Sequence, residues 1–266
     1  MDKTMQYQDR VLAYRVEGSG APLVLVHGFA EDGGIWESQI TFLREKYRLI
    51  IPDLPGCGRS AALAGEISID DAAEAVRAIL DAEKIGVCAG IGHSMGGYIV
   101  LALAEKYPER LKAAGLFHST AYADSEEKKV MRRKCIEFIR KNGAAAFIRQ
   151  TTPNLFAATT RAQEPEMVEA LIDRYLSFDP QSLAAYYEAM IRRQDRTEVL
   201  RQFEGPFLFV IGEEDQAVPL AASLPQTYLP GQAHIHILKR AGHLGMLEDP
   251  ARSNQILDSF LTNVYE

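Results

Sequence analysis

The sequence predicts an α/β fold: a mainly parallel sheet of about eight strands, flanked by helices, with a helical insertion late in the chain. Short apolar runs alternate with amphipathic stretches over residues 5–117, and the same alternation returns after about residue 205. The apolar runs are mostly continuous, which is typical of parallel strands covered on both faces. Between these two parts lies a long stretch whose periodicity fits only helices.

The first half of the chain is predicted to contain five strands. Residues 5–16 alternate loosely and break at Gly18, so they are predicted to form an opening antiparallel strand or hairpin. Continuous apolar runs predict buried strands at residues 23–26, 47–52, 85–91 and 111–117, with helices between them at 35–45, 68–83 and 98–107. The helix at 68–83 begins with a polar cap and an acidic first turn.

The second half of the chain is predicted to begin with an inserted cap. No strand-like run appears between about residues 122 and 200, where four segments fit helices, at 126–141, 144–150, 165–177 and 180–193. We therefore predict a core of residues 1–121 and 201–266 and a cap of residues 122–200. Strands are then predicted at 207–211 and 235–238, and helices at 220–228 and 250–264.

Composition favours a small molecule as the partner. The chain has 266 residues, 47% of them hydrophobic, which is enough for a substantial core. Its formal charge of -7 comes from interspersed charges, with no long basic tract, so nucleic acid and anionic membranes are not expected as partners. Three widely spaced cysteines indicate neither a disulfide framework nor a zinc site. The start of the chain lacks an apolar leader segment, so we expect a cytoplasmic protein. We expect it to be a monomer or a homodimer.

The sequence Gly-His-Ser-Met-Gly-Gly at residues 92–97 lies where a predicted strand ends and a predicted helix begins. Glycines two residues before and after Ser94 fit a sharp turn, in which a side chain at Gly92 or Gly96 would collide with neighbouring backbone. Such a turn would expose the hydroxyl of Ser94 above the sheet. The N–H of Met95 and the start of the helix would then face any negative charge that forms beside it. The motif predicts a nucleophile with an oxyanion donor.

Two later loops could supply an acid and a base. The strand at 207–211 runs into Glu213, Glu214 and Asp215, and the strand at 235–238 is followed by His243. Both loops lie at the carboxyl edge of the predicted sheet, which also carries Ser94. The order serine, acid, histidine is the order found for nucleophile turns of this kind. The residues alone leave three candidates for the acid.

These motifs together resemble the α/β-hydrolase fold superfamily, in its cap-bearing, esterase-like branch of serine hydrolases. The resemblance covers nearly the whole chain outside the cap and depends on residues 27–29, 53–60, 92–97, 212–215 and 242–243. It implies that the acid is Asp215 and that a second oxyanion N–H comes from Phe29. Because the nucleophile position holds Ser94, the chain departs from relatives with an aspartate there, the haloalkane dehalogenases and epoxide hydrolases.

The remaining five histidines have other predicted roles. His118 follows a strand end and is predicted to bind substrate, whereas His27 and His93 are expected to orient backbone around the site. His234 and His236 could form a metal pair, but no third ligand is evident, so no metal is expected. The sequence has no dinucleotide fingerprint, and we expect no cofactor.

The predicted function is hydrolysis of a small ester, thioester or lactone through a Ser-His-Asp triad and an acyl-enzyme. Cleavage of a carbon–carbon bond in a diketone-like substrate is an alternative on the same scaffold. A triad-bearing receptor that signals after binding a small ligand is another. The cap aromatics Phe138, Phe147, Phe156 and Tyr175 could pack helices together or face the cleft, and periodicity does not separate these two roles.

Overall fold

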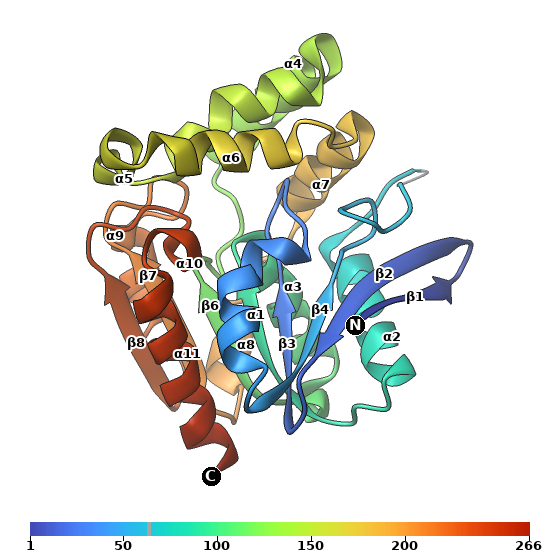
Figure 1. Cartoon of the computed structure of the whole chain (residues 1–266), viewed down its shortest axis with the longest axis vertical. Helices are drawn as coiled ribbons and strands as arrows, with labels where there is room; N and C mark the ends of the chain where they lie inside the picture. Colours follow the sequence, from blue (N-terminus) through green and yellow to red (C-terminus); the bar gives the residue numbers. More distant parts are fainter. Residues whose placement is uncertain (63–64) are drawn as a thin grey trace.

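The computed structural model describes residues 1–62 and 65–266 and contains an eight-stranded sheet with the strand order β1-β2-β4-β3-β5-β6-β7-β8 (Figure 1). The strands are β1 (Asp2–Tyr7), β2 (Arg10–Glu17), β3 (Ala21–Val26), β4 (Tyr47–Pro52), β5 (Cys88–His93), β6 (Leu111–Phe117), β7 (Phe207–Gly212) and β8 (Ala233–Leu238). β1 pairs with β2, and β2 with β4, in antiparallel orientation, whereas the pairs from β4 to β8 are parallel. The predicted mainly parallel sheet is confirmed, and its opening segment is a hairpin.

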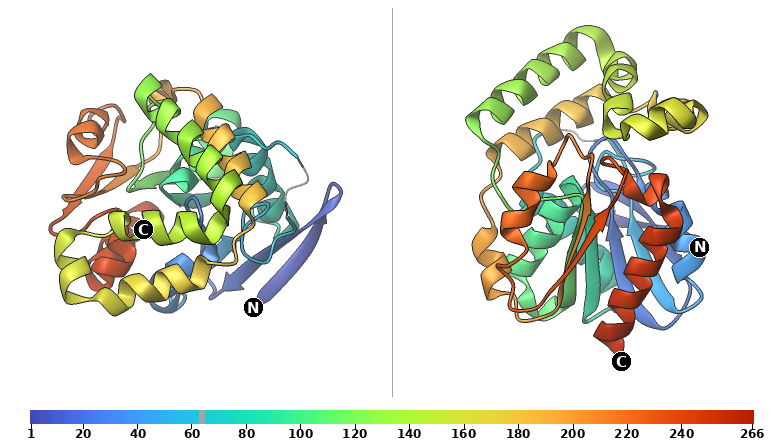
Figure 2. Two further views of the ribbon diagram at one scale, coloured as in Figure 1. Left: turned by 90° about the horizontal axis from the view of Figure 1, so that it is seen from above. Right: turned by 90° about the vertical axis from the view of Figure 1, so that its left-hand side faces the viewer.

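Helices cover both faces of the sheet. α1 (Glu37–Leu43) packs against α11 (Pro250–Tyr265) on one face, and α3 (Met95–Lys106) packs against α2 (Ile69–Ala82) and α8 (Thr197–Gln202) on the other (Figure 2). This two-sided cover explains the continuous apolar runs, because side chains on both faces of a central strand are buried; Leu23 to Val26 are fully inaccessible to solvent. α2 begins with the predicted cap, a box in which Ser68 and Asp71 exchange hydrogen bonds.

Between β6 and β7 the structure describes every residue, and all regular elements there are helical. They are α4 (Glu126–Thr151), the 3-10 turn η3 (Thr152–Leu155), α5 (Ala158–Gln163), α6 (Pro165–Tyr175), α7 (Pro180–Arg192) and α8. Helices α4 to α7 lie across the carboxyl ends of the parallel strands, at the top of Figure 1. Tyr186 Oη on α7 donates to the carbonyl of Pro55 at 2.8 Å, which ties this layer to the loop after β4. The predicted helical insertion is confirmed, while its division from the core at residues 122 and 200 stays a prediction.

Several predicted helices have different limits in the structure. α4 covers both helices predicted at 126–141 and 144–150, and a non-helical Gly143 (φ 84°, ψ 167°) lies at their predicted boundary. The helix predicted at 220–228 is wrong beyond α9 (Leu220–Ser223), because Pro225 lacks an N–H and the chain tightens into a 3-10 turn. The short helices α5, α8 and α10 (Gly245–Glu248) were not predicted, since one or two turns give little periodicity. None of the helices within residues 1–62 and 65–266 has the length and apolar character needed to cross a lipid bilayer.

Candidate active site

Ser94 occupies the sharp turn between β5 and α3, with backbone angles of φ 50° and ψ -116°. This conformation is unfavourable for a residue with a side chain, costing about 1–3 kcal/mol, and persists only where the surroundings enforce it. A Cβ atom on Gly92 would lie 2.2 Å from the carbonyl group of Gly96, and one on Gly96 would lie 2.3 Å from the oxygen of Val26. The collision predicted for both glycines is confirmed. The turn is fixed further by the Ser94 N–H, which donates to the carbonyl of Phe117 at 3.0 Å.

The side chains of Ser94, His243 and Asp215 form a continuous chain of hydrogen bonds. His243 Nε2 lies 2.8 Å from Ser94 Oγ, and His243 Nδ1 lies 2.8 Å from Asp215 Oδ2. Since a carboxylate only accepts, Nδ1 carries the hydrogen and Nε2 is left to accept from the serine hydroxyl. The other oxygen of Asp215 accepts the N–H groups of Ala217 and Val218 at 2.8 and 2.9 Å, which locks the carboxylate in place.

Of the three candidate acids, Asp215 is the one that contacts His243. Asp215 is only 3% exposed, whereas Glu213 points into solvent. Glu214 is half-buried and accepts the N–H of Ala158 on the helical insertion at 3.1 Å. Burial opposes ionisation of Asp215, but the interactions of its carboxylate with His243 and His118 outweigh burial and hold the pKa of Asp215 well below its ordinary value. The acid is therefore a carboxylate at neutral pH.

The loop after β3 brings the backbone of Phe29 to the same edge as Met95, the first residue of α3. The ring of His27 fixes this loop: its Nδ1 lies 2.8 Å from the carbonyl of Gly28, and its Nε2 accepts the N–H of Leu54 at 3.0 Å. Within residues 1–62 and 65–266, no hydrogen bond uses the N–H of Phe29 or of Met95. Neither N–H therefore has a hydrogen-bond partner among the described residues, and their predicted role as oxyanion donors stays a prediction.

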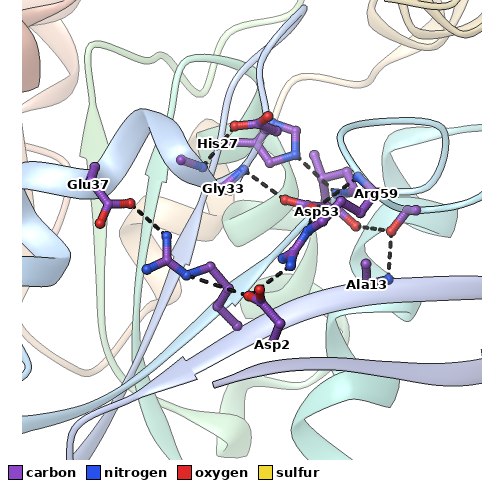
Figure 3. A network of polar contacts seen from close by, with 12 residues as sticks. Asp2, Ala13, His27, Gly33, Glu37, Asp53 and Arg59 are labelled. Carbon is purple, nitrogen blue, oxygen red and sulfur yellow. Dashed lines mark hydrogen bonds and ion pairs between the residues drawn. The ribbon is translucent and has the colours of Figure 1, made fainter. Parts of the chain in front are cut away.

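A polar network beside β1 and β2 holds the loops after β3 and β4 together (Figure 3). The buried carboxylate of Asp53 accepts the N–H of Gly33 at 3.0 Å and the N–H of Arg59 at 3.1 Å. Arg59 also forms an ion pair with Asp2 at 2.7 Å, which extends the network to the first strand. The network therefore supports the loop that follows β3 from the loop that follows β4 and from the first strand.

A third histidine, His93, contacts the backbone of His243. Its Nδ1 lies 3.0 Å from Glu31 Oε2, and its Nε2 lies 2.9 Å from the carbonyl oxygen of His243. Both partners are acceptors, so both ring nitrogens must carry hydrogens and His93 is an imidazolium. Burial opposes each charge, yet their mutual attraction raises the pKa of His93 and lowers that of Glu31. Glu31 also accepts the N–H of Gly28 at 2.8 Å, so the predicted backbone-orienting role of His93 is confirmed.

We expect the Glu31→Gln substitution to reduce the free energy of unfolding by about 3 kcal/mol near pH 6, because it removes one partner of a buried ion pair. The pKa of Glu31 is lowered, so its carboxylate stabilises the fold above about pH 4.3. The pKa of His93 is raised above its ordinary value of about 6.5, so the stabilisation from its positive charge is lost as the pH rises past this raised pKa. The difference between wild type and variant should therefore shrink on the alkaline side. Urea unfolding at several pH values measures it, and a difference that grows above pH 8 would contradict the ion pair.

The structure corrects the prediction that His118 binds substrate. His118 follows β6 with φ 50°, its side chain is fully buried, and it does not line the cavity beside Ser94. Its Nδ1 lies 3.5 Å from Asp215 Oδ2, behind the acid, and Cβ atoms on Gly212 or Gly245 would collide with its ring. Burial lowers the pKa of His118 to about 4, so it is neutral and does not compete with His243 as a cation.

A cavity of about 660 Å³ lies between the sheet edge and the helical insertion, and Ser94 and His243 open into it. Aromatic side chains form part of its wall: the ring of Phe29 lies 4.2 Å from that of Tyr187 and 6.2 Å from that of Phe147, measured between centroids. Of the four cap aromatics considered in the sequence, Phe147 and Tyr175 line this cavity and Phe138 and Phe156 do not. The N–H of His243 donates to the carbonyl of Leu155 in η3 at 2.7 Å, which couples the insertion to the site.

Sequence reasoning missed several residues that face the cavity: Tyr98, Lys128, Arg132 and Tyr187. Tyr98 had a usable signal, because it follows Ser94 by four residues and so lies one helical turn from it. Lys128 and Arg132 lie on α4, whose apolar and polar positions are mixed, and Tyr187 lies in the middle of α7.

A model of the alpha/beta hydrolase family matches residues 23–256 of the chain. The fold is similar to that of a thermophilic esterase from Thermogutta terrifontis, with a TM-score of 0.94, 30% identity and 100% of both chains covered. An enol-lactonase from Burkholderia xenovorans LB400 gives a TM-score of 0.90 at 25% identity, over 98% of this chain and 100% of that chain.

A curated relative shows the same likeness in sequence. The pimeloyl-(acyl-carrier protein) methyl ester esterase of Aeromonas hydrophila subsp. hydrophila is 29% identical over 253 residues, which span 92% of this chain and 96% of the relative. The likeness thus extends over the core and over the helical insertion.

Proposed function

Because the chain belongs to the alpha/beta hydrolase family, we propose that it is a serine hydrolase that cleaves a small ester, thioester or lactone. The observation that carries the proposal is the hydrogen-bonded chain of Ser94, His243 and Asp215, which opens into a cavity. The N–H groups of Phe29 and Met95, which have no partner among the described residues, support it. Each part has a defined task in acyl transfer, and in the proposal residues 122–200 act as the cap that closes the cavity.

In the proposed first step, Ser94 Oγ attacks the carbonyl carbon of the substrate while His243 Nε2 takes the hydroxyl proton. The carbonyl oxygen becomes an anion and accepts hydrogen bonds from the N–H groups of Phe29 and Met95. Such donors are already oriented before reaction, so they stabilise the transition state without a reorganisation cost. Asp215 stabilises the imidazolium and holds the His243 ring in the required tautomer.

Collapse of this intermediate breaks the bond to the leaving oxygen or sulfur, which receives the proton from His243. The product is an acyl-enzyme on Ser94 Oγ. Water then attacks the acyl carbon, with His243 again acting as base, and releases the acid and the free serine. For a lactone, this first collapse opens the ring, the new hydroxyl group stays attached to the acyl chain, and hydrolysis of the acyl-enzyme releases a single hydroxy acid.

The choice of ester and lactone substrates is supported by the relatives, which include two esterases and an enol-lactonase over nearly the full chain. The cavity supports a small substrate, since about 660 Å³ is in the range of pockets that enclose small organic molecules.

Hydrolysis of p-nitrophenyl esters of graded acyl length by the purified protein tests the proposal. We expect repeated turnover of short esters, with a preference set by the cavity, followed as release of p-nitrophenolate. A single slow turnover with a persistent adduct would contradict hydrolysis and indicate a ligand receptor. Inactivity on esters combined with acid release from a ring-cleavage diketone would indicate carbon–carbon bond cleavage.

A further inference from the structure

A buried cluster of charges lies where the helical insertion meets the core. Asp124 is fully buried, and its two carboxylate oxygens contact Arg193 Nη1 at 2.8 Å and Arg132 Nε at 2.5 Å. The side chain of Arg193 is 2% exposed and that of Arg132 is 11% exposed. One carboxylate therefore faces two guanidinium groups, which leaves an excess positive charge in a buried position. Such a charge is costly unless an anion or water offsets it.

A third cation stands beside this cluster. Lys128 precedes Arg132 by one turn of α4, so the two side chains share a face of the helix, and both line the cavity that contains Ser94. Lys128 Nζ donates to the neutral carbonyl of Ala217 at 2.9 Å. In the part of the chain that the structure describes, no carboxylate lies within ion-pair distance of Lys128. Like charges at this spacing weaken a helix, so helix stability does not explain why Lys128 and Arg132 are neighbours.

The carboxylates that line the cavity do not neutralise these cations. Glu31 is already committed to His93 at 3.0 Å, and Glu127 is exposed on the first turn of α4. Arg132 uses Nε and Nη2 toward Asp124, and among the described residues its Nη1 has no hydrogen-bond acceptor. Donors of both Arg132 and Lys128 are thus available at the cavity wall.

Tyr98 connects this positive region to the nucleophile. It is 3% exposed, lines the cavity and follows Ser94 by one turn of α3. The guanidinium of Arg193 lies 4.0 Å from the centre of its ring. Burial alone would raise the pKa of Tyr98, but Arg193, Lys128 and Arg132 outweigh burial and lower it. Through Tyr98, the buried cluster of charges contacts the first turn of α3, the helix that begins next to Ser94.

We propose that Arg132 and Lys128 bind a carboxylate of the substrate, so that the natural substrate class is an ester or lactone bearing a second, anionic carboxylate a few atoms from the scissile carbonyl. The inference rests on the proposed hydrolase function and narrows it. An arginine with a free Nη1 and a neighbouring ammonium suit a carboxylate, which accepts several hydrogen bonds at once. Such a group would offset the excess charge around Asp124 and hold the scissile bond over Ser94.

Two esters with five-carbon acyl chains separate charge from length: mono-p-nitrophenyl glutarate, which has a free carboxylate, and p-nitrophenyl pentanoate, which does not. We expect wild type to favour the glutarate ester in kcat/KM. Arg132→Gln and Lys128→Gln should each lower the ratio of kcat/KM for the glutarate ester to kcat/KM for the pentanoate ester by about 10- to 100-fold. Lys129→Gln is the matched control, because Lys129 is on the same turn but pairs with Glu126 outside the cavity.

Binding of free glutarate, measured by titration calorimetry, provides a readout that does not depend on turnover. We expect glutarate to bind wild type and Lys129→Gln and to bind Lys128→Gln at least about tenfold more weakly. Lys128→Gln leaves the contacts of Asp124 with both arginines intact, so it keeps the test valid if Arg132→Gln fails to fold.

Turnover of pentanoate without preference for the glutarate ester, together with no glutarate binding, would overturn the carboxylate site and leave the hydrolase function standing. Inactivity on both esters would instead reject the hydrolase function. In that case glutarate binding that requires Lys128 would still support an anion site, and its absence would reject both.

Discussion

The Ser94→Ala protein is expected to lose about four to six orders of magnitude in kcat on a short p-nitrophenyl ester, while keeping its fold. The hydroxyl is the group that would form the acyl-enzyme, and no other hydroxyl lies in hydrogen-bond contact with His243 Nε2 among the described residues. Alanine replaces serine without filling new space, and the strained backbone at this position is unchanged. Circular dichroism and the thermal midpoint should therefore match those of wild type.

Two comparisons make the Ser94 test decisive. Ser177→Ala, at an exposed serine, should retain activity within about twofold. A fluorophosphonate probe should add one label to wild type and to Ser177→Ala in intact-mass measurements, and none to Ser94→Ala. Full activity or continued labelling of the Ser94→Ala protein would rule out Ser94 as the nucleophile.

The second large effect is expected for Asp215→Asn, which should lower kcat by about 10³- to 10⁴-fold. An amide has no negative charge to stabilise the imidazolium, and its NH₂ group can donate to His243 Nδ1. The imidazole would then carry its hydrogen on Nε2, where it can no longer accept the proton of Ser94. The amide oxygen still accepts the N–H groups of Ala217 and Val218, so the loop should keep its conformation.

Glu213→Gln and Glu214→Gln are matched controls for this substitution, since each removes one negative charge from the same turn. Glu213 is exposed, and a glutamine at position 214 can still accept the N–H of Ala158. Both variants should stay within a few-fold of wild type in kcat. If either loses more activity than Asp215→Asn, the acid has been assigned to the wrong residue.

Local sequence patterns were sufficient for the sheet and for the turn that presents Ser94. Continuous apolar runs marked the buried strands because both faces of a parallel strand are covered by helices. Gly92 and Gly96 marked the turn because backbone from adjacent elements comes within 2.3 Å of where their Cβ atoms would be. Each of these requirements restricts the type of a single residue, so it can be recognised in the sequence alone.

The choice of Asp215 among three acids was only partly a local matter. The residues placed Glu213, Glu214 and Asp215 at the correct edge, and the resemblance to a family singled out the last of them. The structure separates them by burial and direction, because the turn points Asp215 toward His243 and Glu213 into solvent. The direction of a side chain in a loop depends on backbone angles that no periodic pattern encodes.

By itself the sequence determined the α/β fold, most of its strands and longer helices, and the placement of Ser94, His243 and three candidate acids at one edge of the sheet. Only the tertiary structure decided that His118 lies behind the acid, that His93 and Glu31 form a buried ion pair, and that Arg132 and Lys128 face the cavity. The first two contacts join core residues more than fifty positions apart, whereas the positions of Arg132 and Lys128 depend on how the helical insertion packs on the core. Secondary structure follows from near neighbours along the chain, whereas the shape and charge of a cavity arise from side chains that only folding brings together.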